Sequence, residues 1–119
     1  MFAPRTGPSQ NLVYVWLMKF CSPYGHYPNG LPHPWIRKAS ALIAVSSVFD
    51  RTEEKYDNRG LRHIYTEYGH CAQNVSLITT ELGLGACSIG GFIDDGLNEL
   101  LDFDKIDESI IGVIAIGTI

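Results

Sequence analysis

The sequence predicts an α+β domain in which buried strands pack against one long helix. Apolar segments rich in β-branched and aromatic residues predict three strands, at residues 11–18 (NLVYVWLM), 41–49 (ALIAVSSVF) and 109–116 (SIIGVIAI). Between the second and third of these, apolar residues recur at helical spacing from Leu61 to Leu82. A chain of 119 residues, 45% of them hydrophobic, is long enough to bury a core and indicates one globular domain.

The helix is expected to run from about Gly60 to Leu82, with apolar positions at Leu61, Ile64, Tyr65, Tyr68, Ala72, Val75, Ile78 and Leu82. Such a helix would be roughly 34 Å long at 1.5 Å per residue. A compact domain of this size has a diameter of about 35 Å. Because an element that crosses the whole domain is hard to cover on all sides, we expect a partner subunit to cover part of it.

Two further segments have readable patterns. Four prolines and two glycines in residues 21–35 indicate a loop without regular structure. Asp94 or Asp95 is a candidate N-cap for a short helix in DGLNELLDF.

The net charge and the cysteines indicate which kinds of binding partner and which cellular compartment suit this chain. A net charge of −4 with scattered basic residues argues against nucleic acid or an anionic membrane as a partner. Three widely spaced cysteines fit a reduced, cytoplasmic protein better than a disulfide scaffold. The chain has neither C-x-x-C nor H-E-x-x-H, so zinc is the weaker alternative and we predict no metal site.

The stretch GLGACSIGGF, residues 83–92, holds four glycines where one would end the helix. Gly83 alone can supply the left-handed residue after the last turn. The remaining glycines indicate a close approach of backbone or ligand. It is not a dinucleotide-binding loop, because Ser88 stands where the third glycine of G-x-G-x-x-G belongs and the order here is helix then strand.

Several motifs occur together in the order found in a known group: K-Y, E-x-G-H-x-x-Q-N, G-L-G-x-x-x-I-G-G-F and D-D-x-L-N-x-L-L, followed by IIGVIAIG. With these motifs, residues 50–117 resemble the C-terminal half of the SagB/ThcOx-type dehydrogenases of the nitroreductase superfamily. Two weaker similarities lie upstream, in RTGPSQNLVYVW and in GHYPNGLPH.

The resemblance implies a partial nitroreductase-like fold, with mostly antiparallel strands on a long central helix, over a single truncated domain at residues 1–119. It also implies a homodimer with FMN at the subunit interface. The family's N-terminal phosphate clamp and C-terminal basic segment have no match, so the FMN phosphate site is expected to be incomplete. The implied flavin-binding residues are Arg5, Pro8, Ser9, Ser88, Ile89, Gly90 and Gly91.

The same resemblance assigns catalysis to Lys55 and Tyr56, the pair implicated in deprotonation when azoline rings of modified peptides are oxidised to azoles. Two alternatives stay open. TEEKYDNRG can be a solvated charged loop, and the chain can be a non-catalytic, dimerising remnant with weak or no flavin binding. His70 and Gln73 lie in the predicted helix and are expected to be structural.

Overall fold

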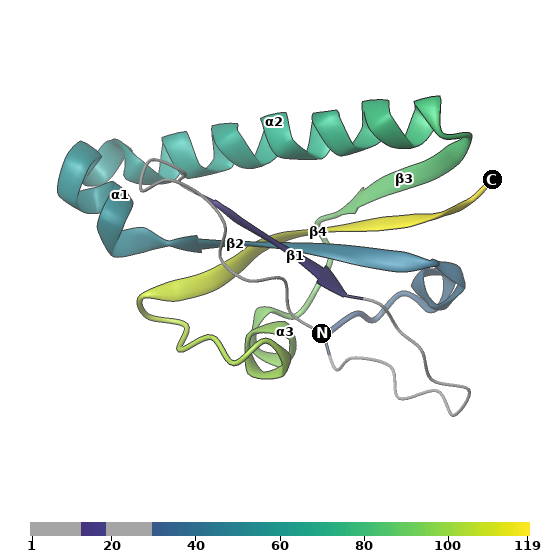
Figure 1. The fold of residues 1–119 in the computed structure, drawn as a ribbon. Helices are drawn as coiled ribbons and strands as arrows, with labels where there is room; N and C mark the ends of the chain where they lie inside the picture. The colour runs from purple at the N-terminus through teal and green to yellow at the C-terminus, as the bar shows by residue number, and fades with distance from the viewer. Residues whose placement is uncertain (1–12, 19–29) are drawn as a thin grey trace.

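The structure, a computed structural model, describes residues 13–18 and 30–119 (Figure 1). Its centre is a four-stranded sheet with the order β1-β2-β4-β3, and every neighbouring pair is antiparallel. The strands are β1 (Tyr14–Met18), β2 (Ala41–Val48), β3 (Leu84–Ile89) and β4 (Glu108–Thr118). The predicted α+β class with antiparallel strands on a long helix is therefore confirmed.

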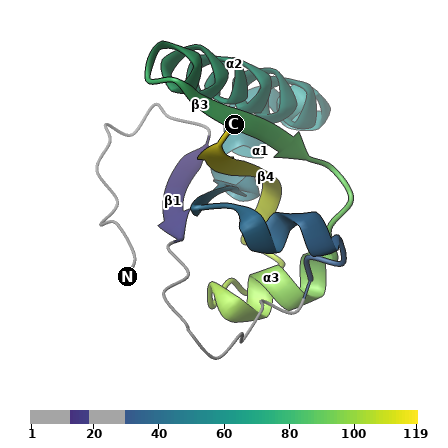
Figure 2. The ribbon, with the colours of Figure 1, turned by 90° about the vertical axis from the view of Figure 1, so that its right-hand side faces the viewer.

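Helices cover both faces of the sheet, as Figure 2 shows. Helix α2 (Gly60–Glu81) lies on one face and α3 (Asp94–Leu100) on the other. Consecutive residues of β2 and β4 are buried because side chains that alternate between the faces meet cover on each side; examples are Ala44 and Val45 in β2 and Val113 and Ile114 in β4. The continuous apolar runs in the sequence reflect this two-sided burial.

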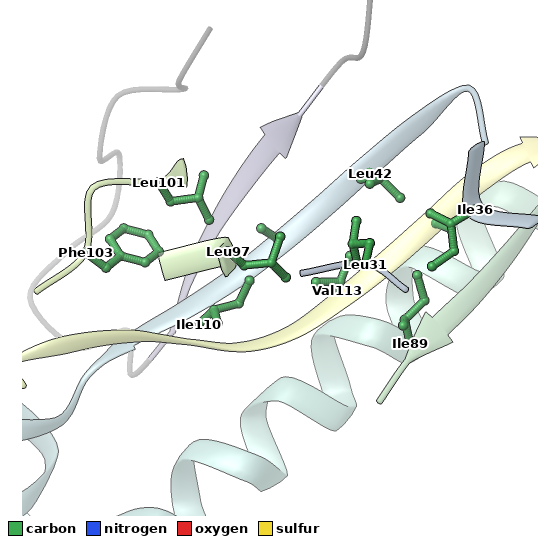
Figure 3. Close-up of a cluster of buried hydrophobic side chains, with 11 residues drawn as sticks. Leu31, Ile36, Leu42, Ile89, Leu97, Leu101, Phe103, Ile110 and Val113 are labelled. Atoms are coloured by element: carbon green, nitrogen blue, oxygen red, sulfur yellow. The ribbon is translucent and has the colours of Figure 1, made fainter. Parts of the chain in front are cut away.

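Two hydrophobic clusters follow from this arrangement. On the α3 side, Leu97 of α3 is fully buried among side chains from the sheet and from the segment around Leu31 (Figure 3). Gly30 fits beneath α3 with a left-handed φ of 118°, and its carbonyl accepts the Ile93 N–H at 2.7 Å. On the α2 side, Ile64 and Val45 form a smaller cluster with Tyr68 packed against it.

Helix α2 is confirmed as predicted, ending one residue earlier than expected. Gly83 follows it with φ of 72°, the left-handed conformation expected after the last turn. The predicted apolar stripe is divided: Ile64 and Ala72 face the sheet, whereas Leu77, Ile78 and Leu82 are 60–66% exposed. Much of the apolar surface of α2 thus has no cover from residues 13–18 and 30–119 of the same chain.

The polar stretch after β2 is largely exposed, as the solvated-loop alternative expects, but it is helical and not a loop. Residues Phe49–Tyr56 form α1, and a 3-10 turn, η2 (Asp57–Arg59), joins it to α2. Phe49 therefore begins α1 instead of ending the strand. The buried Thr52 explains why charged residues form a helix here, because it packs against Gly60 and gives α1 a face to bury.

Three smaller expectations also change. The glycine-rich stretch is mostly strand, since β3 occupies six of its residues, Leu84–Ile89. Neither Asp94 nor Asp95 caps α3. Both lie in its first turn, after the extended Ile93, and their negative charges there interact favourably with the positive end of the helix dipole. Within the expected loop at 21–35, Pro34 begins a 3-10 helix, η1 (Pro34–Lys38), as the first-turn position allows.

Tyr68 of α2 lies directly on the backbone of β4 at Gly112. A Cβ at Gly112 would overlap three atoms of the Tyr68 phenol group. Gly112 is buried and pairs with Val45 beside a register shift in β2. Gly112 is thus required because the ring of a helix residue occupies the space that a side chain would take.

This contact predicts the effect of a substitution. Gly112→Ala should lower the free energy of unfolding by about 1–3 kcal/mol, the usual cost of overpacking, because the Tyr68 ring must move. Gly69→Ala is the matched control: it lies in α2 with open space around it, and should raise stability by up to about 1 kcal/mol. Urea unfolding measures both, and equal stabilities for the two variants would contradict the contact.

Candidate functional site

A cavity of about 600 Å³ lies where the end of β3 meets α2, α3 and the start of β4. Its volume is in the range of small-molecule sites, about 300–1,000 Å³. Residues from each of these elements line it, among them Tyr68, Ser88, Ile89, Gly90, Asp94 and Asn98. The cavity therefore joins segments that are distant in the sequence.

The glycine edge, residues 88–91, borders this cavity. Pairing with β4 ends at Ile89, opposite Val113, so the two glycines lie beyond the last paired residue. At Gly90 a Cβ would meet nothing within 4 Å. The backbone here is open to a ligand on the cavity side.

Gly91 has a different role. A Cβ at Gly91 would come within 2.9 Å of Nε2 of His33, whose ring stacks at 6.3 Å from that of Trp35. Gly91 thus makes room for an imidazole, while Gly90 leaves space empty. The two adjacent glycines serve two different needs.

Asn98 holds α3 against β4 at the side of the cavity. It is 2% exposed; its side-chain oxygen accepts the Ile110 N–H at 2.8 Å, and its side-chain nitrogen donates to Ser109 Oγ at 3.0 Å. These bonds satisfy the buried amide, which would otherwise cost about 1–3 kcal/mol per unpaired group. Asn98 is the asparagine of the D-D-x-L-N-x-L-L motif, but its role is not visible in the sequence because its partners lie eleven and twelve residues away.

The rim beside α3 carries negative charge. Asp94 and Asp95 lie in the first turn of α3, and Lys105 forms an exposed ion pair with Asp95 at 3.1 Å. Such exposed pairs contribute little to stability. The rim keeps an excess of acid over base, which opposes an anionic group placed there.

Tyr68 is the second lining residue that the sequence did not reveal as part of a site. Burial raises its pKa above the ordinary value, and a hydrogen bond with the Ser88 side chain opposes that shift. One turn along α2, burial also raises the pKa of Cys71, with a smaller contribution from Glu67. The phenol therefore stays protonated at neutral pH and is available for hydrogen bonding.

Of the predicted flavin-binding residues, Ser88, Ile89 and Gly90 line the cavity, and Gly91 follows directly. Arg5, Pro8 and Ser9 lie outside the residues that the structure describes.

Lys55 and Tyr56 lie at the end of α1 and do not line the cavity. The Lys55 Nζ is 5.2 Å from the centre of the Tyr56 ring, which contacts His63 at 4.4 Å between ring centres. The structure thus brings this pair together with a histidine of α2, apart from the glycine edge of the same chain.

The described residues contain neither a cluster of metal ligands nor a membrane-spanning helix. No three histidine, cysteine or acidic side chains in residues 13–18 and 30–119 are grouped so that they could hold a metal ion. Within the same residues, no helix combines the length and the apolar character needed to cross a membrane.

Comparison with known proteins identifies the family. The family model described as the nitroreductase family matches residues 11–118. The chain belongs to the nitroreductase family. A candidate nitroreductase of Methanocaldococcus jannaschii is 37% identical over 87 residues, which are 73% of this chain and 42% of that protein. This nitroreductase-family chain thus spans about two fifths of the length of that relative.

Solved structures show the same fold. A candidate nitroreductase from Anabaena variabilis superposes with a TM-score of 0.66 at 33% identity, covering 71% of this chain and 17% of that one. The E. coli microcin synthetase McbBCD complex, with truncated pro-MccB17 bound, gives a TM-score of 0.66 at 22% identity. That match covers 68% of this chain and 30% of the other, and it shows likeness of fold alone.

Proposed function

We propose that this nitroreductase-family chain is an FMN-dependent oxidoreductase and that the glycine edge receives the isoalloxazine ring. The observation that carries the proposal is the open backbone at Gly90, which borders a cavity of about 600 Å³. FMN, when bound, supplies a planar ring that accepts a hydride at N5. Main-chain N–H groups beside the ring would favour the negative charge that develops on reduction.

The residues present fit one end of FMN better than the other. Tyr68 and the exposed backbone of Gly90 offer an apolar wall and polar groups of the kind that flavin rings contact. Asp94 and Asp95 would repel a phosphate. We therefore propose that the ring lies in this cavity and that the phosphate lies away from α3.

Gly90→Val tests this placement. Because a Cβ at Gly90 meets no atom within 4 Å and the residue has no positive φ, the variant should fold normally, but its side chain would occupy the proposed ring site. The dissociation constant for FMN, measured by fluorescence quenching, should rise roughly tenfold or more, since overpacking costs about 1–3 kcal/mol.

Ser76→Ala, about two turns beyond Tyr68 along α2 and outside the cavity lining, serves as the control and should bind FMN like the unsubstituted chain. An unchanged affinity for FMN in Gly90→Val would contradict the placement of the isoalloxazine ring at Gly90. No saturable binding by the unsubstituted chain would favour the non-catalytic, dimerising remnant.

The proposed substrate is an azoline ring in a modified peptide. The fold likeness to the microcin synthetase complex, whose structure holds a pro-peptide, and the adjacent Lys55 and Tyr56 support it. In this proposal Lys55 takes the proton that leaves the azoline ring, and Tyr56 relays it. Because the pair lies apart from the glycine edge of its own chain, the proposal requires the substrate to reach both, or the second subunit to contribute one of them.

Replacing Lys55 with Ala, or Tyr56 with Phe, should slow the conversion of azoline to azole by about a hundredfold or more, the scale of a lost general base. FMN content should stay the same, because neither residue lines the cavity. Mass spectrometry of the peptide product measures the conversion. Lys38→Ala, at an exposed lysine of η1, is the control, and full turnover in both test variants would remove the catalytic assignment.

We further propose a homodimer that covers the exposed part of α2, and a cytoplasmic location. Leu77 and Ile78 of α2 and Leu82 just after it expose their apolar side chains, and exposed apolar patches mark protein–protein contacts. The free thiols Cys71 and Cys87 fit a reducing compartment.

Sedimentation at micromolar concentration should show a dimer. Ile78→Glu should shift it toward monomer, because a charge would have to be buried in the interface. Ile106→Glu is the matched control: Ile106 is 80% exposed in the segment between α3 and β4, and its replacement should leave the dimer intact. A folded monomer at all concentrations would contradict the proposal.

A further inference from the structure

Tyr68 connects three parts of the site through one side chain. Its ring packs against the buried cluster of Ile64 and Val45, its phenol end lies on the backbone of Gly112, and its hydroxyl shares a hydrogen bond with Ser88. The same residue lines the cavity beside the glycine edge.

We propose that Tyr68 is a positioning residue of the flavin site, which fixes the glycine edge through Ser88 and sets one wall of the cavity with its ring. The inference rests on the proposed function, since it concerns how that site is held in shape. It adds a residue that neither the motifs nor the predicted flavin contacts include.

The end of β3 needs such support. Among the strands that the structure describes, β3 is the last in the sheet order and pairs with β4 alone. Its last paired residues are Ser88 and Ile89, and the next two are glycines, the most conformationally free residues. Without further contacts, the backbone that borders the cavity would sample many conformations.

The strand end is held from both faces of the sheet. Because side chains alternate along a strand, Ile89 points toward the α3 side, where it is buried in the larger cluster with Leu97. Ser88 lies on the opposite face, toward α2, and lines the cavity together with Tyr68; its side chain lowers the pKa of the Tyr68 phenol by hydrogen bonding. Two contacts thus hold the backbone directly before Gly90: the apolar side chain of Ile89 on the α3 side and the polar side chain of Ser88 on the α2 side.

Tyr68 is itself well placed for this task. Ser88 pairs with Ile114, and Gly112 lies two residues earlier on the same face of β4, so the ring crosses β4 to reach Ser88. The absent side chain at Gly112 lets the phenol lie low on the sheet. A site that is already ordered before the ligand binds loses less conformational entropy on binding, and its affinity is correspondingly higher.

The test is a double-mutant cycle on FMN affinity. Tyr68→Phe keeps the ring and removes the hydroxyl, and Ser88→Ala removes its partner at an exposed position that should not disturb folding. Each should raise the dissociation constant about fivefold, the effect of one neutral hydrogen bond, and the double variant should bind like either single variant. Ser76→Ala, whose hydroxyl bonds only to Ala72 O in the same helix, is the control and should change affinity less than twofold.

A second measurement separates positioning from general stability. The Ser88 hydrogen bond lowers the pKa of Tyr68, so Ser88→Ala should raise the pH at which this phenol ionises. The difference in tyrosinate absorbance between each protein and its Tyr68→Phe counterpart reports that pH, with or without FMN. Ser76→Ala should leave it where it is.

The outcomes are distinct. FMN binding by the unsubstituted chain, with equal affinity in Tyr68→Phe, would overturn the inference and leave the proposed function standing. Independent, additive effects of the two substitutions would also overturn it. No FMN binding by the unsubstituted chain would overturn the proposed function and, with it, the role given to Tyr68.

Discussion

The contact between the Tyr68 ring and the Gly112 backbone sets the spacing between the long helix and the sheet. Because the ring fills the space of a side chain on the central strand, α2 can approach β4 only where a glycine faces it. That approach places the phenol within reach of Ser88 and forms one wall of the cavity. The shape of the site thus depends on packing at Gly112, a residue that does not itself line the cavity.

The cavity lies where the two hydrophobic clusters meet the end of a strand. On one side α3 is held by the buried amide of Asn98, and on the other α2 is held by Tyr68. Both supports are polar groups at the boundary of an apolar core. There the contribution to stability depends on the geometry of the hydrogen bonds more than on the apolar area buried. Between them the backbone of Gly90 is left without side-chain cover.

Much of this fold could be predicted from the sequence because its signals are local. The helical period located α2 to within one residue, and the apolar runs located three strands. The glycine-rich stretch was recognised as special, yet β3 within it was seen mainly as a turn. Glycine has low strand propensity, and here the pairing with β4 overrides it.

The supports of the site were beyond sequence reasoning for a physical reason. Tyr68 and Gly112 are 44 residues apart in number, and each has an ordinary local explanation, one as a helix core residue and the other as a weak strand residue. Asn98 likewise depends on the Ile110 N–H across a loop. Alternating burial at Ser88 and Ile89 becomes visible only once the edge position of β3 is known. The motifs predict a ligand at the glycine edge, and tertiary contacts supply what holds that backbone in place.

The position of β4 in the sheet has a consequence for how the chain acquires its shape during synthesis. This strand follows every other described element in the sequence, yet it pairs with β2 on one side and β3 on the other. Until it emerges from the ribosome, β2 and β3 have no common partner, and α2 has no Gly112 on which to settle. The pairing of Ser46 in β2 with Ile110 in β4 also closes a loop of more than sixty residues. Contacts between residues so far apart in the sequence slow folding. The apolar segments of β2 and α2 therefore stay without their partner strand until β4 has been translated, and exposed apolar segments of this kind are the ones that chaperones bind.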